Sequence, residues 1–151
     1  MINSLFFDSV LINDISVISG VRYNGRTVDN SHSGRKQHGF LYIHSGEATF
    51  YINGTEFVVL AGNLVYIPKN KKYRMVYTAE STTFVVVNFM LQDLYGKDRI
   101  LFENIQVVFK DQKTNALAQV RTKFELCSAS KNIGAVFRKK ELMYRLLGQV
   151  F

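Results

Sequence analysis

Residues 39–73, GFLYIHSGEATFYINGTEFVVLAGNLVYIPKNKKY, carry the clearest structural signals in the chain. In this stretch, short apolar segments rich in β-branched and aromatic residues alternate with glycines, with Asn53–Gly54 and with Pro68. Asn and Gly tolerate the positive φ that a type I′ turn requires, so Asn53–Gly54 predicts a tight hairpin. Proline cannot donate a hydrogen bond to a neighbouring strand, so Pro68 predicts a strand end. The stretch therefore predicts four short strands, at residues 40–46, 47–54, 55–62 and 63–68.

The same pattern continues on both sides of this stretch. YRMVYT (73–78) and STTFVVVNFML (81–91) predict two more strands, and DISVISGVRYNG (14–25) predicts one or two upstream. TVDNSHSGRKQ (27–37) is polar and is expected to be a loop. Turn signals at such short, regular spacing are typical of all-β sandwiches and barrels. We therefore expect a mainly β domain over residues 1–112.

The last forty residues change to a helical period. Residues 114–127 and 132–150 predict two helices, separated by a polar segment. The first carries an apolar stripe of Leu117, Val120, Phe124 and Cys127. The second is apolar over more than one stripe, which indicates two packing partners. One partner would be the barrel and the other a second chain, unless the helix is wholly buried in its own domain.

Composition limits the classes of protein that the chain can represent. The 151 residues carry a net charge of +7, which favours an anionic ligand only weakly because the basic residues are scattered. Cys127 is the single cysteine, so an internal disulfide and a cysteine-rich metal cluster are both excluded. A reducing cytoplasm is the expected location, and no apolar run reaches the roughly 18 residues of a membrane span.

Residues 39–73, the strand ending VVVNF and the two helices together carry a resemblance to a known family. The chain resembles the cupin barrel, a double-stranded β-helix, and more closely the N-terminal domain of AraC-type transcription regulators. This resemblance covers roughly residues 15–150 and implies a ligand-binding barrel with an N-terminal arm (1–112) and a helical dimerisation segment (113–151). It also implies a fragment whose DNA-binding domain lies outside these residues.

The resemblance does not extend to the metal site of metallic cupins. Such a cupin carries a His-x-His pair before the first strand, whereas here His32 and His38 are too far apart in the sequence. Tyr73 stands where the second motif would place its histidine. A transition metal needs three or four converging N, O or S ligands. We therefore expect a barrel without a metal and without another cofactor.

The resemblance implies a small effector inside the barrel, and the mixture of aromatic, amide and cationic residues expected there suits a sugar or a small acid. Tyr73 and Met75 share one strand face by the two-residue period, as do Phe84 and Asn88 on the last strand. Asn88 is a lone amide in an apolar run and needs a partner if it is buried. The expected ligand-binding residues are Arg35, His38, Tyr73, Met75, Phe84 and Asn88.

The expected function is therefore effector sensing and dimerisation in an AraC-type regulator, with no enzymatic activity. The dimer would form through the last helix, at Phe137, Met143, Leu146 and Leu147. DNA binding would belong to a missing C-terminal domain, because these apolar helices are poor groove readers. Two alternatives remain open: a stand-alone cupin enzyme such as an isomerase or dioxygenase-like protein, and a barrel used only for protein–protein contact.

Overall fold

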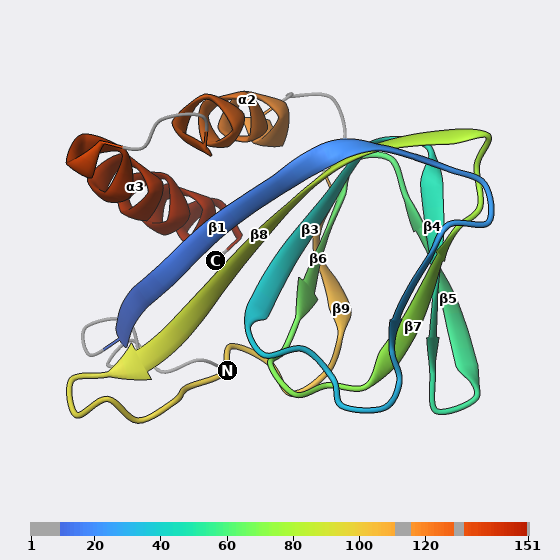
Figure 1. Ribbon diagram of the computed structural model, residues 1–151, viewed down its shortest axis with the longest axis horizontal. Helices are drawn as coiled ribbons and strands as arrows, with labels where there is room; N and C mark the ends of the chain where they lie inside the picture. Colours follow the sequence, from blue (N-terminus) through green and yellow to red (C-terminus); the bar gives the residue numbers. More distant parts are fainter. Residues whose placement is uncertain (1–9, 111–115, 129–131, 151) are drawn as a thin grey trace.

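The computed structural model describes residues 10–110, 116–128 and 132–150. Figure 1 shows strands β1 to β9 with helices α2 and α3 at one side. The strands are β1 (Val10–Tyr23), β2 (Thr27–Asn30), β3 (His38–Ser45), β4 (Glu47–Ile52), β5 (Thr55–Leu60), β6 (Asn63–Ile67), β7 (Tyr73–Tyr77), β8 (Ser81–Asp93) and β9 (Gln106–Lys110). The helices are α2 (Ala116–Ser128) and α3 (Ile133–Val150). The predicted N-terminal arm and the predicted boundary at 112–113 lie at least partly outside the described residues.

The strands form two antiparallel sheets that face each other. The five-stranded sheet has the order β1-β8-β3-β6-β9, and the four-stranded sheet has the order β2-β7-β4-β5. Chain-adjacent strands β3 and β4 lie in different sheets, as do β5 and β6, so the chain crosses repeatedly between the two layers. The result is a barrel-like sandwich whose interior is reached by side chains of both sheets.

The turn signals of the sequence explain the central hairpin. Asn53 (φ 50°) and Gly54 (φ 77°) both adopt the positive φ expected of a type I′ turn, and they join β4 to β5. β6 ends at Ile67, directly before Pro68, as predicted. Two strands were not predicted. β2 lies inside the segment 27–37, which was expected to be a loop, and no strand was expected at the residues of β9.

The central strand β3 is buried on both faces, which explains its continuous apolar sequence. Leu41 and Ile43 belong to the core between the two sheets, together with Phe50, Val65 and Met75. Phe40 and Tyr42 point the other way and belong to a second core. Alternation along the strand therefore divides one apolar run between two hydrophobic cores.

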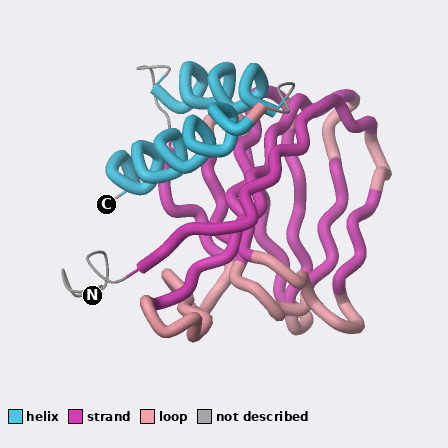
Figure 2. Tube along the Cα trace, turned by 60° about the vertical axis from the view of Figure 1, so that its left-hand side comes forward, coloured by secondary structure: helices cyan, strands magenta, loops and turns pink. Residues whose placement is uncertain are grey.

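Helices α2 and α3 cover the outer face of the five-stranded sheet, and Figure 2 shows both on the same side of the strands. Phe124 and Cys127 of α2 are buried in this second core, and α3 contributes Ala135, Leu142, Met143, Leu146 and Leu147 to the buried residues. The side chains of Leu117 and Val120 lie outside the described residues. The helical layer is therefore part of the fold of this chain.

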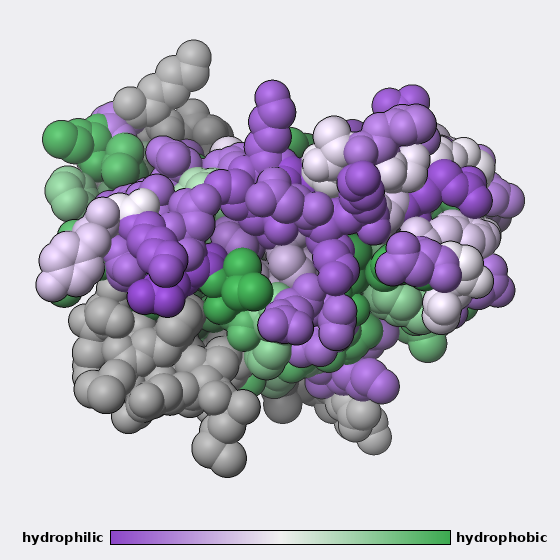
Figure 3. All heavy atoms as spheres, turned by 90° about the horizontal axis from the view of Figure 1, so that it is seen from below, coloured by the Kyte–Doolittle hydropathy of each residue, from purple (hydrophilic) through white to green (hydrophobic). Residues whose placement is uncertain are grey.

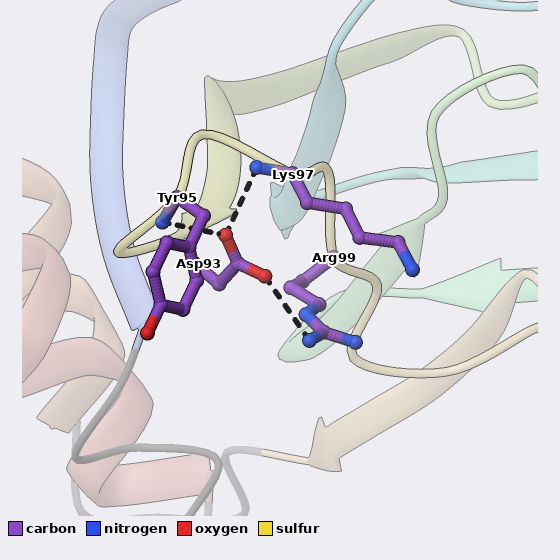
Figure 4. A network of polar contacts seen from close by, with 4 residues as sticks. All are labelled: Asp93, Tyr95, Lys97 and Arg99. Atoms are coloured by element: carbon purple, nitrogen blue, oxygen red, sulfur yellow. Dashed lines mark hydrogen bonds and ion pairs between the residues drawn. The ribbon is translucent and has the colours of Figure 1, made fainter.

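Loops 31–37, 68–72 and 94–105 gather at the lower end of the molecule in Figure 1. Seen from that end, the surface is largely hydrophilic, with small hydrophobic areas between the polar side chains (Figure 3). Asp93 organises the loop that follows β8: its carboxylate accepts the backbone N–H groups of Tyr95 and Lys97 at 2.8 and 3.0 Å and pairs with Arg99 (Figure 4). These hydrogen bonds lower the pKa of Asp93, and the one from the backbone N–H of Lys97 has the largest effect.

Candidate ligand-binding site

A cavity of about 520 Å³ lies between the two sheets. Most of its wall is apolar and comes from both sheets: Ile18, Val28, Leu41, Ile67, Met75, Phe84 and Val86. Its size falls within the range of small-molecule sites in proteins. The barrel is therefore not filled completely by its own side chains.

Polar side chains also line the cavity, and its charges have one sign. The neutral polar lining comprises Asn30, Ser33, Gln37, Tyr73, Tyr77 and Asn88. The charged lining residues are Arg22, Arg35 and Lys36, all cations. No described carboxylate lines the cavity, so its electrostatic potential favours a negatively charged occupant.

Arg35 and Asn88 meet at the end of the cavity that loop 31–37 borders. Nη2 of Arg35 donates a hydrogen bond to Oδ1 of Asn88, although the two residues are 53 positions apart in the sequence. The amide nitrogen of Asn88 faces Oγ of Ser16 on β1, at 3.5 Å. Among the described residues no carboxylate forms an ion pair with Arg35. Its charge is half-buried, and within the described part of the chain the amide oxygen of Asn88 is the only acceptor that it contacts.

Arg22 and Tyr77 lie at the Phe84 end of the cavity. The guanidinium carbon of Arg22 is 5.1 Å from the centroid of the Phe84 ring, a cation–π contact. Tyr77 packs against the same ring, with 5.7 Å between the centroids. Burial raises the pKa of Tyr77 to about 12 despite the nearby Arg22 charge. Tyr77 is therefore a neutral phenol at physiological pH and can donate a hydrogen bond.

The structure brings five of the six expected ligand residues to this one cavity. Arg35, Tyr73, Met75, Phe84 and Asn88 all line it. Arg22 and Tyr77 also line the cavity and were not predicted, although Tyr77 shares the strand parity of Tyr73 and Met75. Arg22 carried no such signal, because its place depends on how β1 pairs with β8.

His38 is the exception, and its expected role is corrected. It begins β3 with the parity of Phe40 and Tyr42, so its side chain faces away from the cavity. The ring is fully buried and stacks on Tyr66 with 6.0 Å between centroids. Nδ1 accepts hydrogen bonds from the backbone N–H of Lys69 at 3.1 Å and from the hydroxyl of Tyr66 at 3.0 Å. His38 therefore joins the barrel to the loop at 68–72.

His38 predicts a pH dependence of stability. Burial, with the nearby Lys69 charge, lowers its pKa from 6.5 to about 4. The unfolded chain thus binds more protons than the folded chain between those values, so stability is full above pH 6.5 and falls as the pH drops to 4. The expected loss is about 3 kcal/mol. Urea unfolding at several pH values should show this slope, and His38→Gln, which keeps an acceptor without a titrating ring, should flatten it.

The described residues do not fit a cupin-type metal centre. Among them, no three His, Cys, Asp or Glu side chains lie close enough together to hold a metal ion. At the position of the second-motif histidine, Tyr73 presents a phenol to the cavity.

Comparison with known proteins supports the reading of the barrel. Residues 21–89 match the sequence model of the cupin domain. The barrel has a cupin fold. The cupin barrel and its two C-terminal helices agree with the fold predicted from the sequence. A search of curated protein sequences finds no match.

Solved structures resemble the chain over different lengths. ToxT K231A from Vibrio cholerae matches with a TM-score of 0.58 at 12% identity, over 94% of this chain. ToxT bound to (E)-4-(8-methylnaphthalen-1-yl)but-3-enoic acid matches with a TM-score of 0.52 at 7% identity, over 87% of this chain. A cupin 2 conserved barrel protein from Salinispora arenicola covers only 49% of the chain, with a TM-score of 0.43, 20% identity and 61% of its own length aligned. The chain spans 55% of the length of ToxT in both ToxT comparisons.

Proposed function

We propose that this chain is the effector-sensing and dimerisation domain of an AraC-family transcription regulator, which takes a small molecule into its cupin barrel. The observation that carries the proposal is the cavity of about 520 Å³, which combines an apolar wall with polar and cationic side chains. Such a combination is what small-molecule sites usually have. A sugar and a small acid are both compatible with a site of this size.

The likeness to ToxT, a regulator of the AraC family, supports the proposal because it extends past the barrel into the helices. One matched ToxT structure holds an organic acid. In this proposal, DNA binding belongs to a domain outside these 151 residues, and the protein acts in the cytoplasm. None of the described helices combines the length and hydrophobicity that crossing a membrane requires.

The proposed dimer surface differs from the one that the sequence suggested. Met143, Leu146 and Leu147 are buried in the core beneath α3, so a partner cannot reach them. Phe137 is 66% exposed and remains a candidate. It lies on one outer stripe of α3 with Ile133, Val136 and Tyr144, at helical spacings of three, four and seven. Exposed apolar stripes of this kind commonly mark contact surfaces, and we assign the homodimer to this one.

A ligand screen tests the sensing function. Purified chain should gain thermal stability from at least one member of a panel of sugars and organic acids. At 100 times its Kd a ligand stabilises by about 2.7 kcal/mol. Val86→Trp places an indole in the cavity and should abolish the gain for every ligand. Val58→Trp, on the half-exposed outer strand β5, is the matched control and should keep it.

Two results would contradict the function. One is a panel in which no compound stabilises the chain. The other is a stabilisation that survives Val86→Trp, because the ligand would then bind outside the barrel.

A further inference from the structure

The guanidinium of Arg35 lies directly against the backbone of β3 at Gly39. A Cβ atom built on Gly39 would meet the guanidinium carbon at 2.8 Å, Nη1 at 2.8 Å and Nη2 at 2.9 Å. All three nearest atoms belong to Arg35, so no other group occupies this space as closely. The absence of a side chain at residue 39 is therefore what lets the guanidinium reach the cavity wall.

Strand register places the acceptor beside this position. Gly39 pairs with Asn88 of β8 on one side and with Ile67 of β6 on the other. Asn88 and Ile67 both line the cavity. The amide oxygen of Asn88 accepts a hydrogen bond from Nη2 of Arg35 and so fixes the orientation of the planar guanidinium. Gly39 and Asn88 together define one geometry for Arg35.

The backbone of Arg35 is held as firmly as its side chain. Its carbonyl oxygen accepts the N–H of Asn70 at 2.8 Å, and the N–H of Gly34 donates to the carbonyl of Asn30 at 3.1 Å. A Cβ on Gly34 would meet the backbone carbon and oxygen of Asn70, each at 2.6 Å. Loop 31–37 is thus packed onto loop 68–72, and Arg35 is presented from a fixed support. A binding group held in advance loses less entropy when its ligand arrives.

Between Asn88 and Phe84 the cavity has a largely apolar wall. From Asn88 to Phe84 the wall runs for four residues along β8, a length of about 13 Å at the usual rise of a strand. Val86 and Leu41 lie in this part of the wall, and Tyr77 and Arg22 stand at its far end. The site therefore has a cation at each end, Arg35 beside Asn88 and Arg22 beside Phe84, with an apolar stretch of several carbon atoms' length between them. The charge of Arg22 already lies over the Phe84 ring, whereas the guanidinium of Arg35 has only the neutral amide of Asn88 as an acceptor among the described residues.

We infer that the ligand of this cavity is a carboxylic acid with an apolar body, that Arg35 binds its carboxylate, and that Gly39 is the positioning residue for Arg35. This inference rests on the proposed sensing function and chooses the acid over the sugar. The guanidinium fork matches the two oxygens of a carboxylate and has no carboxylate partner among the described residues. A neutral ligand would bring no negative charge to this half-buried cation, which has none from the described residues.

Isothermal titration of the 151-residue chain with 4-phenylbutanoate tests the ligand class, and its neutral counterpart is 4-phenylbutanamide. The acid should bind at least about tenfold more tightly than the amide, because hydrogen bonds to charged groups contribute about 1.5–3 kcal/mol. Arg35→Gln should weaken acid binding by about 10- to 100-fold and leave amide binding unchanged. Arg26→Gln removes the same charge from the exposed turn between β1 and β2 and should have no effect.

Gly39→Ala tests the positioning role. The added methyl group displaces only the end of a flexible side chain, so the fold should survive while acid binding falls about tenfold or more. In the Arg35→Gln background the same substitution should cause no further loss. A merely structural effect of the methyl group would instead add to that of Arg35→Gln.

Three outcomes would overturn the inference. They are equal binding of acid and amide, acid binding that Arg35→Gln leaves intact, and no binding of 4-phenylbutanoate at millimolar concentration. The proposed sensing function would still stand in each case if another compound of the panel stabilises the chain and loses its effect in Val86→Trp. A panel without any such compound would instead remove the sensing function itself.

Discussion

Leu146→Asp should unfold the helical layer and lower the free energy of unfolding by about 3–5 kcal/mol. Leu146 is only 3% exposed and lies in the core between α3 and the five-stranded sheet. Met143 and Leu147 belong to the same core. An aspartate there either carries an unpaired charge out of water or is protonated at a similar cost. Because small domains are stable by about 5–15 kcal/mol, much of the total is lost. Urea unfolding followed by circular dichroism measures the effect.

Phe137→Asp is the matched control on the opposite side of the same helix. Phe137 is largely exposed, so the substitution should change the stability of the single chain by less than about 0.5 kcal/mol. It should nevertheless dissociate the proposed dimer, which light scattering coupled to size-exclusion chromatography measures. A folded Leu146→Asp variant would show that the buried face of α3 is not part of the core. If the Phe137→Asp variant still forms a dimer, the outer stripe of α3 is not the interface.

Gly46→Ala should cost about 2–5 kcal/mol, from left-handed strain and from overpacking together. Gly46 joins β3 to β4 with a φ of 91°. A Cβ there would collide with Oγ1 of Thr82 and lie 2.5 Å from the carbonyl oxygen of Ser81. Thr82 cannot move aside freely, because its hydroxyl also bonds the backbone N–H of Glu47 at 3.2 Å and its carbonyl at 3.1 Å. Thermal and urea unfolding should both show the loss.

Gly54→Ala separates the two causes. Gly54 has a similar φ of 77°, yet nothing lies within 4 Å of a Cβ built on it. Only the backbone strain of about 1–2 kcal/mol should therefore appear. If the two substitutions cost the same, the close approach at Thr82 contributes nothing, and the packing explanation for the corner between the two sheets fails.

The strands of residues 38–93 could be predicted because their signals are local. A glycine pair that takes positive φ, or a proline that ends a ladder, acts within a few residues. β2 was missed since its sequence, TVDN, contains one apolar residue and is stabilised by pairing with β7. β9, QVVFK, has the β-branched residues of a strand, but its place is set by pairing with β6. Both are edge strands of their sheets, so neighbours decide them more than their own composition does.

The candidate site was predictable where strand parity suffices. The two-residue period of a strand puts Tyr73 and Met75 on one face of β7, and Phe84 and Asn88 on one face of β8. All four residues line the same cavity. The expected strand began at residue 40, whereas β3 begins at His38. Once the strand is extended to residue 38, the same two-residue period places His38 on the helix side with Phe40 and Tyr42. On α3 the sequence shows a wide apolar surface, but it does not say which part the barrel covers.

Local signals were enough to predict the β-then-α organisation, the turns of the barrel and four residues of the cavity wall, because these follow from backbone preferences and short periods. Those four residues are Tyr73, Met75, Phe84 and Asn88. Tertiary packing was needed to show that Arg35 reaches Asn88, that Gly39 leaves room for it, and that three residues of α3 are buried within the chain. Those three are Met143, Leu146 and Leu147. Arg35 and Asn88 are 53 residues apart, and no local pattern encodes their contact. Such contacts depend on strand order and on the packing of one loop against another, which arise only when the two sheets and the helices assemble.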